Sequence, residues 1–285
     1  MSYPYFLESE LPPTEPDSAL FHVFPAPLEN SVSYGSGAAR GPEAIIKASS
    51  QLETWDGKSE PVKAGIYTYP AVTPKKDTES YLEELARNVE PSAEAGKIPV
   101  VLGGEHTVTL GPVEALLRAH KEPFGVIQFD AHADLRDTYE GSPYSHACVM
   151  RRLCDWNIPI FQIGVRAVSK EETEFRNLKK IPCLDASALA AGKPFQLPRN
   201  FPRDVYITFD VDGLDPSVIP ATGTPVPGGL GWYQTLDILE KIIKKHTIIG
   251  FDVVELAPTK GLHYPEFAAA ELTYRIMGMI QRSRS

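Results

Sequence analysis

Acidic and histidine residues alternate directly after one apolar run. Asp130, His132 and Asp134 follow the run GVIQF, each separated from the next by an alanine. In an extended backbone, residues two apart point to the same side. The spacing can therefore direct two carboxylates and one imidazole toward a common point at the end of a strand, which is typical of metal ligands.

Two further apolar runs end in the same residue types. Asp210 and Asp212 follow the run VYITF, and His106 follows the run IPVVL after two glycines. Sites in open α/β sheets form at the carboxyl ends of the strands. Three strand ends would then supply four carboxylates and two imidazoles, enough for two metal ions. A lone aspartate at a strand end is more often a helix cap or a turn residue, but six donors at these spacings argue against that interpretation.

The donor set indicates which ion such a site would hold. Four neighbouring carboxylates without a cation would repel one another and raise one another's pKa values, so a divalent ion is expected. Mixed oxygen and nitrogen ligands without a thiolate favour Mn²⁺ over Mg²⁺ and over a structural zinc site. Zinc, iron and cobalt remain alternatives. Two such ions activate water, so hydrolysis is the expected class of reaction.

Apolar runs and helical patterns alternate along the chain and predict the elements that position these residues. The runs are typical of buried parallel strands, and Asp77 and the pair Ser169 and Glu172 are typical of helix starts. The alternation predicts an α/β fold with helices on both faces of a mostly parallel sheet. The expected strands are 98–102, 125–130, 159–164, 205–210 and 247–252, and the expected helices are 78–90, one opened by Ser169, and 232–243.

The chain shows no break in this organisation. No flexible linker or internal repeat interrupts it, so residues 1–285 are predicted to form a single domain. Residues 1–20, rich in proline and acidic side chains, are expected to form an N-terminal arm. The segment 212–231 carries four prolines and five glycines. A loop this stiff is expected to shape a site.

The charge balance limits the possible partners. The 285 residues include 28 basic and 37 acidic side chains, for a formal charge of −9. This balance argues against nucleic acid and anionic membranes and suits a small cationic substrate. The three cysteines form no CxxC pair, and the sequence has no signal-peptide pattern or long apolar segment. These features predict a cytoplasmic protein with reduced thiols.

Five motifs occur in a fixed order: GGEH at 103–106, DAHAD at 130–134, SH at 145–146, DVDGLDP at 210–216 with 225–229 following, and DVVE at 252–255. Together they resemble the motifs of the ureohydrolases, the arginase and agmatinase family, from about residue 20 to the C-terminus. The resemblance implies an arginase-like three-layer α/β/α sandwich around a mostly parallel eight-stranded sheet. It also implies two Mn²⁺ ions per subunit, release of urea from a guanidino compound, and a homo-oligomer, either a trimer or a hexamer.

The resemblance further implies a role for each site residue. His146 matches the family's mobile histidine and is the candidate proton shuttle. Glu255 matches the glutamate that pairs with the substrate guanidinium, and Asp134 completes the expected catalytic set. A surface histidine and an internal ion pair are the alternative interpretations of His146 and Glu255. One Mn²⁺ is expected to bind His106, Asp130, Asp134 and Asp210, and the other His132, Asp130, Asp210 and Asp212.

The loop from Leu135 to Tyr144 is expected to select the substrate. It lacks the Asn- and Ser-rich pattern with which arginase-type enzymes bind an α-carboxylate, whereas Asp137 and Glu140 would attract the terminal ammonium of agmatine. Arg136 complicates this interpretation, because its guanidinium could bind a carboxylate or pair with a neighbouring acid. The loop resembles those of bacterial and archaeal agmatinases, which predicts hydrolysis of agmatine to putrescine and urea in polyamine biosynthesis.

Other functions remain alternatives. Guanidinobutyrate and guanidinopropionate hydrolases and arginases share the metal motifs. A non-catalytic relative acting as a binding module is disfavoured, because the ligand set, His146 and Glu255 are all present. A two-metal phosphoesterase is disfavoured because the sequence has no phosphate-binding loop or basic phosphate clamp.

Overall fold

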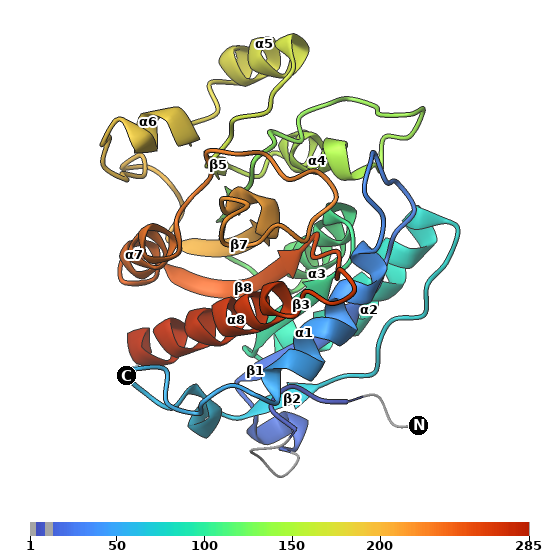
Figure 1. The fold of residues 1–285 in the computed structure, drawn as a ribbon, viewed down its shortest axis with the longest axis vertical. Helices are drawn as coiled ribbons and strands as arrows, with labels where there is room; N and C mark the ends of the chain where they lie inside the picture. The colour runs from blue at the N-terminus through green and yellow to red at the C-terminus, as the bar shows by residue number, and fades with distance from the viewer. Residues whose placement is uncertain (1–3, 9–13, 285) are drawn as a thin grey trace.

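The computed structural model describes residues 4–8 and 14–284, and the strands of this part form one parallel sheet (Figure 1). The strands are β1 (Phe21–Ala26), β2 (Ile66–Thr68), β3 (Ile98–Gly103), β4 (Phe124–Phe129), β5 (Ile160–Ile163), β6 (Cys183–Leu184), β7 (Asp204–Asp210) and β8 (Thr247–Val254). Their order across the sheet is β2-β1-β3-β8-β7-β4-β5-β6. The predicted α/β fold around an eight-stranded parallel sheet is therefore confirmed.

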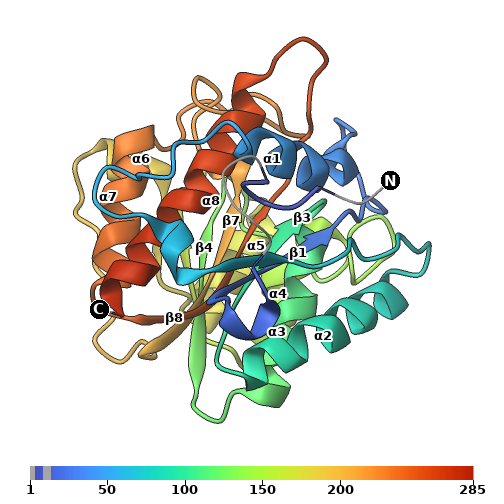
Figure 2. The ribbon, with the colours of Figure 1, turned by 90° about the horizontal axis from the view of Figure 1, so that it is seen from below.

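Helices cover both faces of the sheet, as a three-layer sandwich requires (Figure 2). On one face lie α1 (Gly41–Ser49), α7 (Trp232–Ile243) and α8 (Tyr264–Ser283). On the other lie α2 (Thr78–Glu94), α3 (Leu110–Ala119) and α4 (Val149–Asp155). Two further helices, α5 (Lys170–Lys179) and α6 (Ala186–Ala190), flank β6 in the chain.

The predicted helix starts are also confirmed. The carboxylate of Asp77 accepts a hydrogen bond from the backbone N–H of Ser80 and caps α2. Ser169 and Glu172 form a reciprocal capping box at the start of α5. Each cap satisfies N–H groups that the first turn of a helix leaves without an internal partner. Helix α7 spans the predicted residues 232–243.

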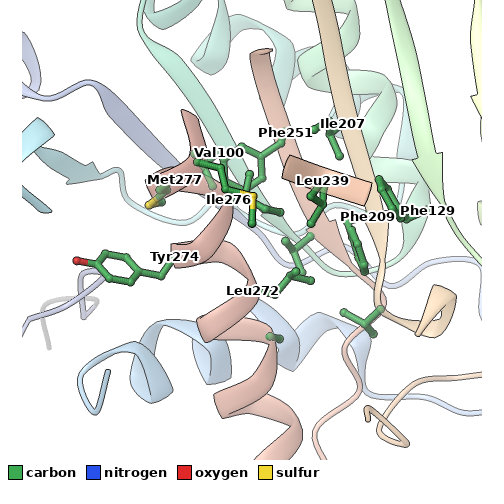
Figure 3. Packing of buried hydrophobic residues seen from close by; sticks show 14 of the residues in the cluster. Val100, Phe129, Ile207, Phe209, Leu239, Phe251, Leu272, Tyr274, Ile276 and Met277 are labelled. Atoms are coloured by element: carbon green, nitrogen blue, oxygen red, sulfur yellow. The ribbon is translucent and has the colours of Figure 1, made fainter. Parts of the chain in front are cut away.

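Two stacked phenylalanines fix the register of the strands that end in the predicted site. Phe129 of β4 and Phe209 of β7 are register partners, and their ring centroids lie 4.9 Å apart (Figure 3). Both rings are buried in the cluster that includes residues of α7 and α8. Burying each ring contributes about 1.5–3 kcal/mol, so a register shift would be costly. Asp130 and Asp210, the next residues in the chain, therefore emerge from adjacent strands.

The structure also adds elements that the sequence patterns did not predict. Strands β1, β2 and β6 were not among the expected runs, and β2 and β6 have only three and two residues. In the expected N-terminal arm, Phe6 and Leu7 are buried, and the backbone N–H of Leu7 donates to the hydroxyl of Ser49. These residues therefore pack on the body of the molecule, whereas 1–3 and 9–13 lie outside the described residues. Within the described chain, no helix combines the length and apolar character needed to cross a membrane.

Candidate metal centre

Four strand ends bring the predicted site residues to one edge of the sheet. His106 begins the 3-10 turn after β3, Asp130 follows β4, Asp210 ends β7, and Glu255 follows β8. These strands are neighbours, in the order β3-β8-β7-β4. The turn before His106 needs glycine, since a Cβ at Gly104 would overlap a neighbouring carbonyl oxygen.

A first cluster surrounds Nδ1 of His106. Three buried carboxylates place an Oδ2 atom near this nitrogen: Asp134 at 2.9 Å, Asp130 at 3.1 Å and Asp210 at 3.5 Å. The other ring nitrogen, Nε2, lies 2.8 Å from the hydroxyl of Thr208, which itself donates to Asp252. Because Thr208 donates its proton there, it accepts from Nε2. This tautomer leaves Nδ1 of His106 free to bind a metal, as second hydrogen bonds usually do for histidine ligands.

A second cluster shares Asp130 with the first. Nδ1 of His132 lies 3.0 Å from Oδ2 of Asp212 and 3.5 Å from Oδ1 of Asp130. Backbone N–H groups orient both carboxylates, since His132 donates to Asp130 and Ala131 donates to Asp212. Each cluster groups its donor atoms closely enough to hold a metal ion. The six predicted ligands are thus brought together, and the bridging role of Asp210 stays a prediction.

Burial and mutual repulsion change the protonation of these groups. Burial, and then the charge of Asp130, raises the pKa of Asp134 to about 7. Burial and the charges of Asp212 and Asp130 raise the pKa of Asp210 well above its usual value. Burial opposes protonation of His132, but its contacts with Asp130 and Asp212 outweigh it and raise its pKa to about 11. Such carboxylates need positive charge to be ionised together. A divalent ion supplies that charge, and oxygen and nitrogen donors without thiolate fit an ion such as Mn²⁺.

The backbone is in an unusual conformation at two carboxylates of the site. Asp134 and Glu255 have φ values of 52° and 65°, in the left-handed region that residues other than glycine rarely adopt. Hydrogen bonds hold both positions: Leu135 N–H donates to Glu172, and Glu255 N–H donates to the carbonyl of Gly104. Backbone strain of this kind concentrates at functional sites, where the surroundings over-determine the geometry.

Glu255 lies beside the first cluster. Its Oε1 accepts a hydrogen bond of 2.6 Å from the backbone N–H of His106, and burial raises its pKa to about 8. Glu255 lines the same cavity as His106, His132 and His146. A carboxylate held in this way is suited to accept hydrogen bonds from a planar guanidinium.

His146 is held by two serines that the sequence analysis did not identify. Its Nε2 lies 2.8 Å from the hydroxyl oxygen of Ser33, and its Nδ1 lies 3.2 Å from that of Ser31. Burial lowers the pKa of His146 to about 4, so the ring is neutral at neutral pH. The serines lie 113 and 115 residues away, in the loop between β1 and α1. Local spacing therefore gave no signal for this contact.

The predicted specificity loop contributes to an outer cavity of about 390 Å³ beside the metal cluster. Arg136 and Tyr139 line this cavity, with the guanidinium carbon 5.3 Å from the ring centroid. The side chain of Asp137 is 68% exposed, and its carboxylate pairs with Arg152 at 2.8 Å. Glu140 is exposed, and neither acid is among the residues that line this cavity. The structure thus brings Arg136 to the site, but not Asp137 or Glu140.

The chain is similar to known proteins over most of its length. A family model described as "Arginase family" matches residues 19–278. The N(1)-aminopropylagmatine ureohydrolase of Synechocystis is 39% identical, over 96% of this chain and 92% of the relative. The agmatinase of Pyrococcus horikoshii is 32% identical, over 96% and 97%. The crystal structure of agmatine ureohydrolase from Thermoplasma volcanium superposes with a TM-score of 0.86 at 29% identity, covering 99% of this chain and 96% of the other.

Proposed function

Because the chain belongs to the arginase family and is a ureohydrolase of guanidino compounds, we propose that it uses two Mn²⁺ ions to hydrolyse a cationic amine of the agmatine type. The observation that carries the proposal is the pair of clusters that share Asp130, with Glu255 and His146 lining the same cavity. Urea and an amine are the expected products.

Six side chains would hold the two ions. When bound, a pair of divalent ions lowers the pKa of water and supplies a nucleophile at neutral pH. The chain's contribution is to fix the donors: Thr208 orients His106, and backbone N–H groups orient Asp130 and Asp212. The proposed ligands are His106, Asp130, His132, Asp134, Asp210 and Asp212.

Glu255 would bind and orient the guanidinium of the substrate. Its carboxylate is fixed by the N–H of His106 and opens onto the cavity that the metal ligands line. A guanidinium presents parallel N–H groups that match the two oxygens of a carboxylate. The positive charge of the substrate would also favour the ionised form of Glu255. The planar carbon would thereby be held next to the ligand cluster.

His146 would deliver the proton that the departing amine needs. An amine is a poor leaving group unless it is protonated, and the neutral ring of His146 can accept a proton and pass it on. Its two nitrogens contact the hydroxyls of Ser33 and Ser31, which can each donate or accept. His146 also lines the outer cavity, which gives the ring access to both substrate and solvent.

Agmatine and N(1)-aminopropylagmatine are the two candidate substrates. Agmatine would give putrescine and urea, as the sequence predicts. The longer amine is the second candidate because several of the similar relatives are named for it. The outer cavity of about 390 Å³ gives its extra aminopropyl group a place beside the site. Polyamine biosynthesis, a cytoplasmic location and a trimer or hexamer are part of the same proposal, supported by the family resemblance.

Urea release from a panel of guanidino compounds tests the proposal. Manganese-treated protein is incubated with agmatine, N(1)-aminopropylagmatine, arginine and guanidinobutyrate at matched concentrations, with Asp130→Asn as the control. We expect strong preference for one of the two amines without a carboxylate. Preference for arginine or guanidinobutyrate would overturn the substrate class and would assign the carboxylate to Arg136, which lines the outer cavity.

A further inference from the structure

Helix α5 docks on the molecule largely through charged side chains, with the half-buried Phe175 as an apolar contact. Its two buried residues are Glu172 and Arg176, which are 5% and 8% exposed. A surface helix ordinarily buries an apolar stripe, and a buried charge is costly unless it is paired and hydrogen-bonded. The helix lies at the outer edge of the fold (Figure 1), yet both buried charges point to residues that support the metal centre.

Arg176 begins a chain of hydrogen bonds that ends on a metal ligand. Its Nε donates to Oε1 of Gln162 at 2.9 Å. Nε2 of Gln162 donates to Oε1 of Gln128 at 2.6 Å, and Nε2 of Gln128 donates to Oδ2 of Asp130 at 2.7 Å. Both glutamines are completely buried, and they are register partners on β5 and β4. Outside the protein core, Arg176 pairs with Asp185.

The direction of this chain follows from the chemistry of its ends. A guanidinium only donates, so Gln162 must accept with its oxygen and donate with its nitrogen. Gln128 must then do the same, and it presents an N–H group to Asp130. The backbone carbonyl of Ala133 accepts a second bond from Gln162 and favours the same orientation. With Oδ1 of Asp130 bonded to the N–H of His132, each oxygen of this shared carboxylate has one fixed donor.

Glu172 supports the neighbouring ligand through the backbone. Its two oxygens accept from the N–H groups of Leu135 and Ser169, at 3.0 and 2.9 Å. Leu135 directly follows Asp134, whose positive φ needs support from its surroundings. The two buried charges of α5, one helical turn apart, therefore reach both Asp130 and Asp134.

We propose that helix α5 is a positioning element for the metal centre, with Arg176 acting through Gln162 and Gln128 on Asp130. The inference rests on the metal centre of the proposed function. Arg176 is a positioning residue, because it touches neither substrate nor metal ligand. By fixing which atom of Gln128 faces Asp130, it keeps the free lone pairs of this carboxylate directed at both clusters.

The test compares Mn²⁺ binding by metal-free Arg176→Met and Arg176→Lys proteins, measured by isothermal titration calorimetry. Removing outer partners of metal ligands typically lowers metal affinity about 10–100-fold. We expect the loss of Mn²⁺ affinity in Arg176→Met to lie near the lower end of this range, because Arg176 acts through two glutamines. Lysine also only donates, so Arg176→Lys should recover affinity to within about threefold of the wild type. Equal affinity of Arg176→Met and the wild type would overturn the proposal.

A matched control separates positioning from general destabilisation. Asp185→Asn weakens the outer ion pair of Arg176 but leaves the series of hydrogen bonds from Arg176 to Asp130 intact. We expect it to lower the Tm of the metal-free protein without changing Mn²⁺ affinity. If Asp185→Asn and Arg176→Met lose affinity equally, Arg176 acts only through stability and the inference fails.

A second variant keeps the test decisive if Arg176→Met does not fold. Gln162→Glu preserves the shape of the side chain but replaces the donating amide with an acceptor, so it too should lower Mn²⁺ affinity. Wild-type affinity in Gln162→Glu would contradict the proposal. Absence of Mn²⁺ binding in the wild type would instead refute the metal centre itself, which distinguishes the two failures.

Discussion

The edge of the sheet that carries His106, Asp130, Asp210 and Glu255 adjoins the loop 135–144. Different forces place the side chains of these two regions. At the edge, the paired Phe129 and Phe209 hold β4 and β7 in register, and the residue that follows each of them, Asp130 or Asp210, is a predicted ligand. In the loop, Asp137 is turned toward Arg152 of α4 by an ion pair. Regular backbone therefore converts sequence spacing directly into geometry, whereas a loop side chain follows whichever partner the rest of the fold supplies.

The largest effect is expected from replacing Asp130, the residue that the two clusters share. Asp130 belongs to both clusters, so Asp130→Asn should lower Mn²⁺ affinity by more than the 10–100-fold typical of outer partners, that is by more than about a hundredfold. Urea release should fall in parallel. Metal content after dialysis, measured by mass spectrometry, checks this expectation. A variant that retains two ions per chain would contradict the sharing of Asp130.

A smaller effect is expected from replacing His146, which lies in a loop beside the predicted ligands. His146→Ala should lower kcat by about 10²–10⁴-fold, since only proton delivery is removed, and should leave metal content and KM unchanged. Ser33→Ala removes one hydrogen bond to the ring, and a neutral bond of this kind is worth about tenfold at most. Steady-state kinetics on both variants distinguish these outcomes. Near-normal kcat in His146→Ala would assign proton delivery to another group.

The pH dependence of the Tm of the metal-free protein tests whether carboxylates at the edge of the sheet are held protonated. Burial raises the pKa of Asp134 to about 7 and that of Glu255 to about 8. A group with a raised pKa in the folded state stabilises the fold at low pH, and this contribution is lost as the pH rises through the folded value. The Tm of the metal-free protein should therefore fall from about pH 4, where these carboxyls lose their protons in the unfolded chain, to about pH 8, by about 2–4 °C per kcal/mol lost.

Added Mn²⁺ is the control for this measurement. Because bound ions stabilise the ionised carboxylates, the Tm of the metal-bound protein should vary much less over the same range. A metal-free Tm that rises with pH would show that the carboxylates at the edge are not held protonated.

The smallest expected effect concerns the outward-facing acids of the loop. The double variant Asp137→Asn and Glu140→Gln should change kcat/KM for agmatine by less than about threefold, because exposed charges are screened by salt. Arg136→Met is the matched comparison, since Arg136 lines the outer cavity, and it should have the larger effect. A loss above about tenfold in the double variant would support the sequence-based assignment of these acids to the substrate.

The same difference between strand ends and loops decides what could be predicted from the sequence. The alternation of Asp130, His132 and Asp134 predicted a metal cluster at the end of a strand, and the three side chains do meet there. The extended backbone assumed in that prediction ends at Phe129, and Asp134 reaches the cluster through a positive φ that the spacing did not indicate. The roles of Ser31 and Gln162 could not be predicted, because their partners lie on other elements. Strands β2 and β6 were missed because two or three residues are too few to show periodicity.

Urea formation measured against bound manganese tests the metal-dependent hydrolysis most directly. Metal-free protein is titrated with Mn²⁺ in the presence of agmatine or N(1)-aminopropylagmatine, and urea and bound metal are determined in the same samples. We predict no urea without metal, a maximum at two ions per chain, and no urea from Asp130→Asn at any point of the titration. Urea formation at the full rate without metal, or none from either amine with two ions bound, would contradict the assignment.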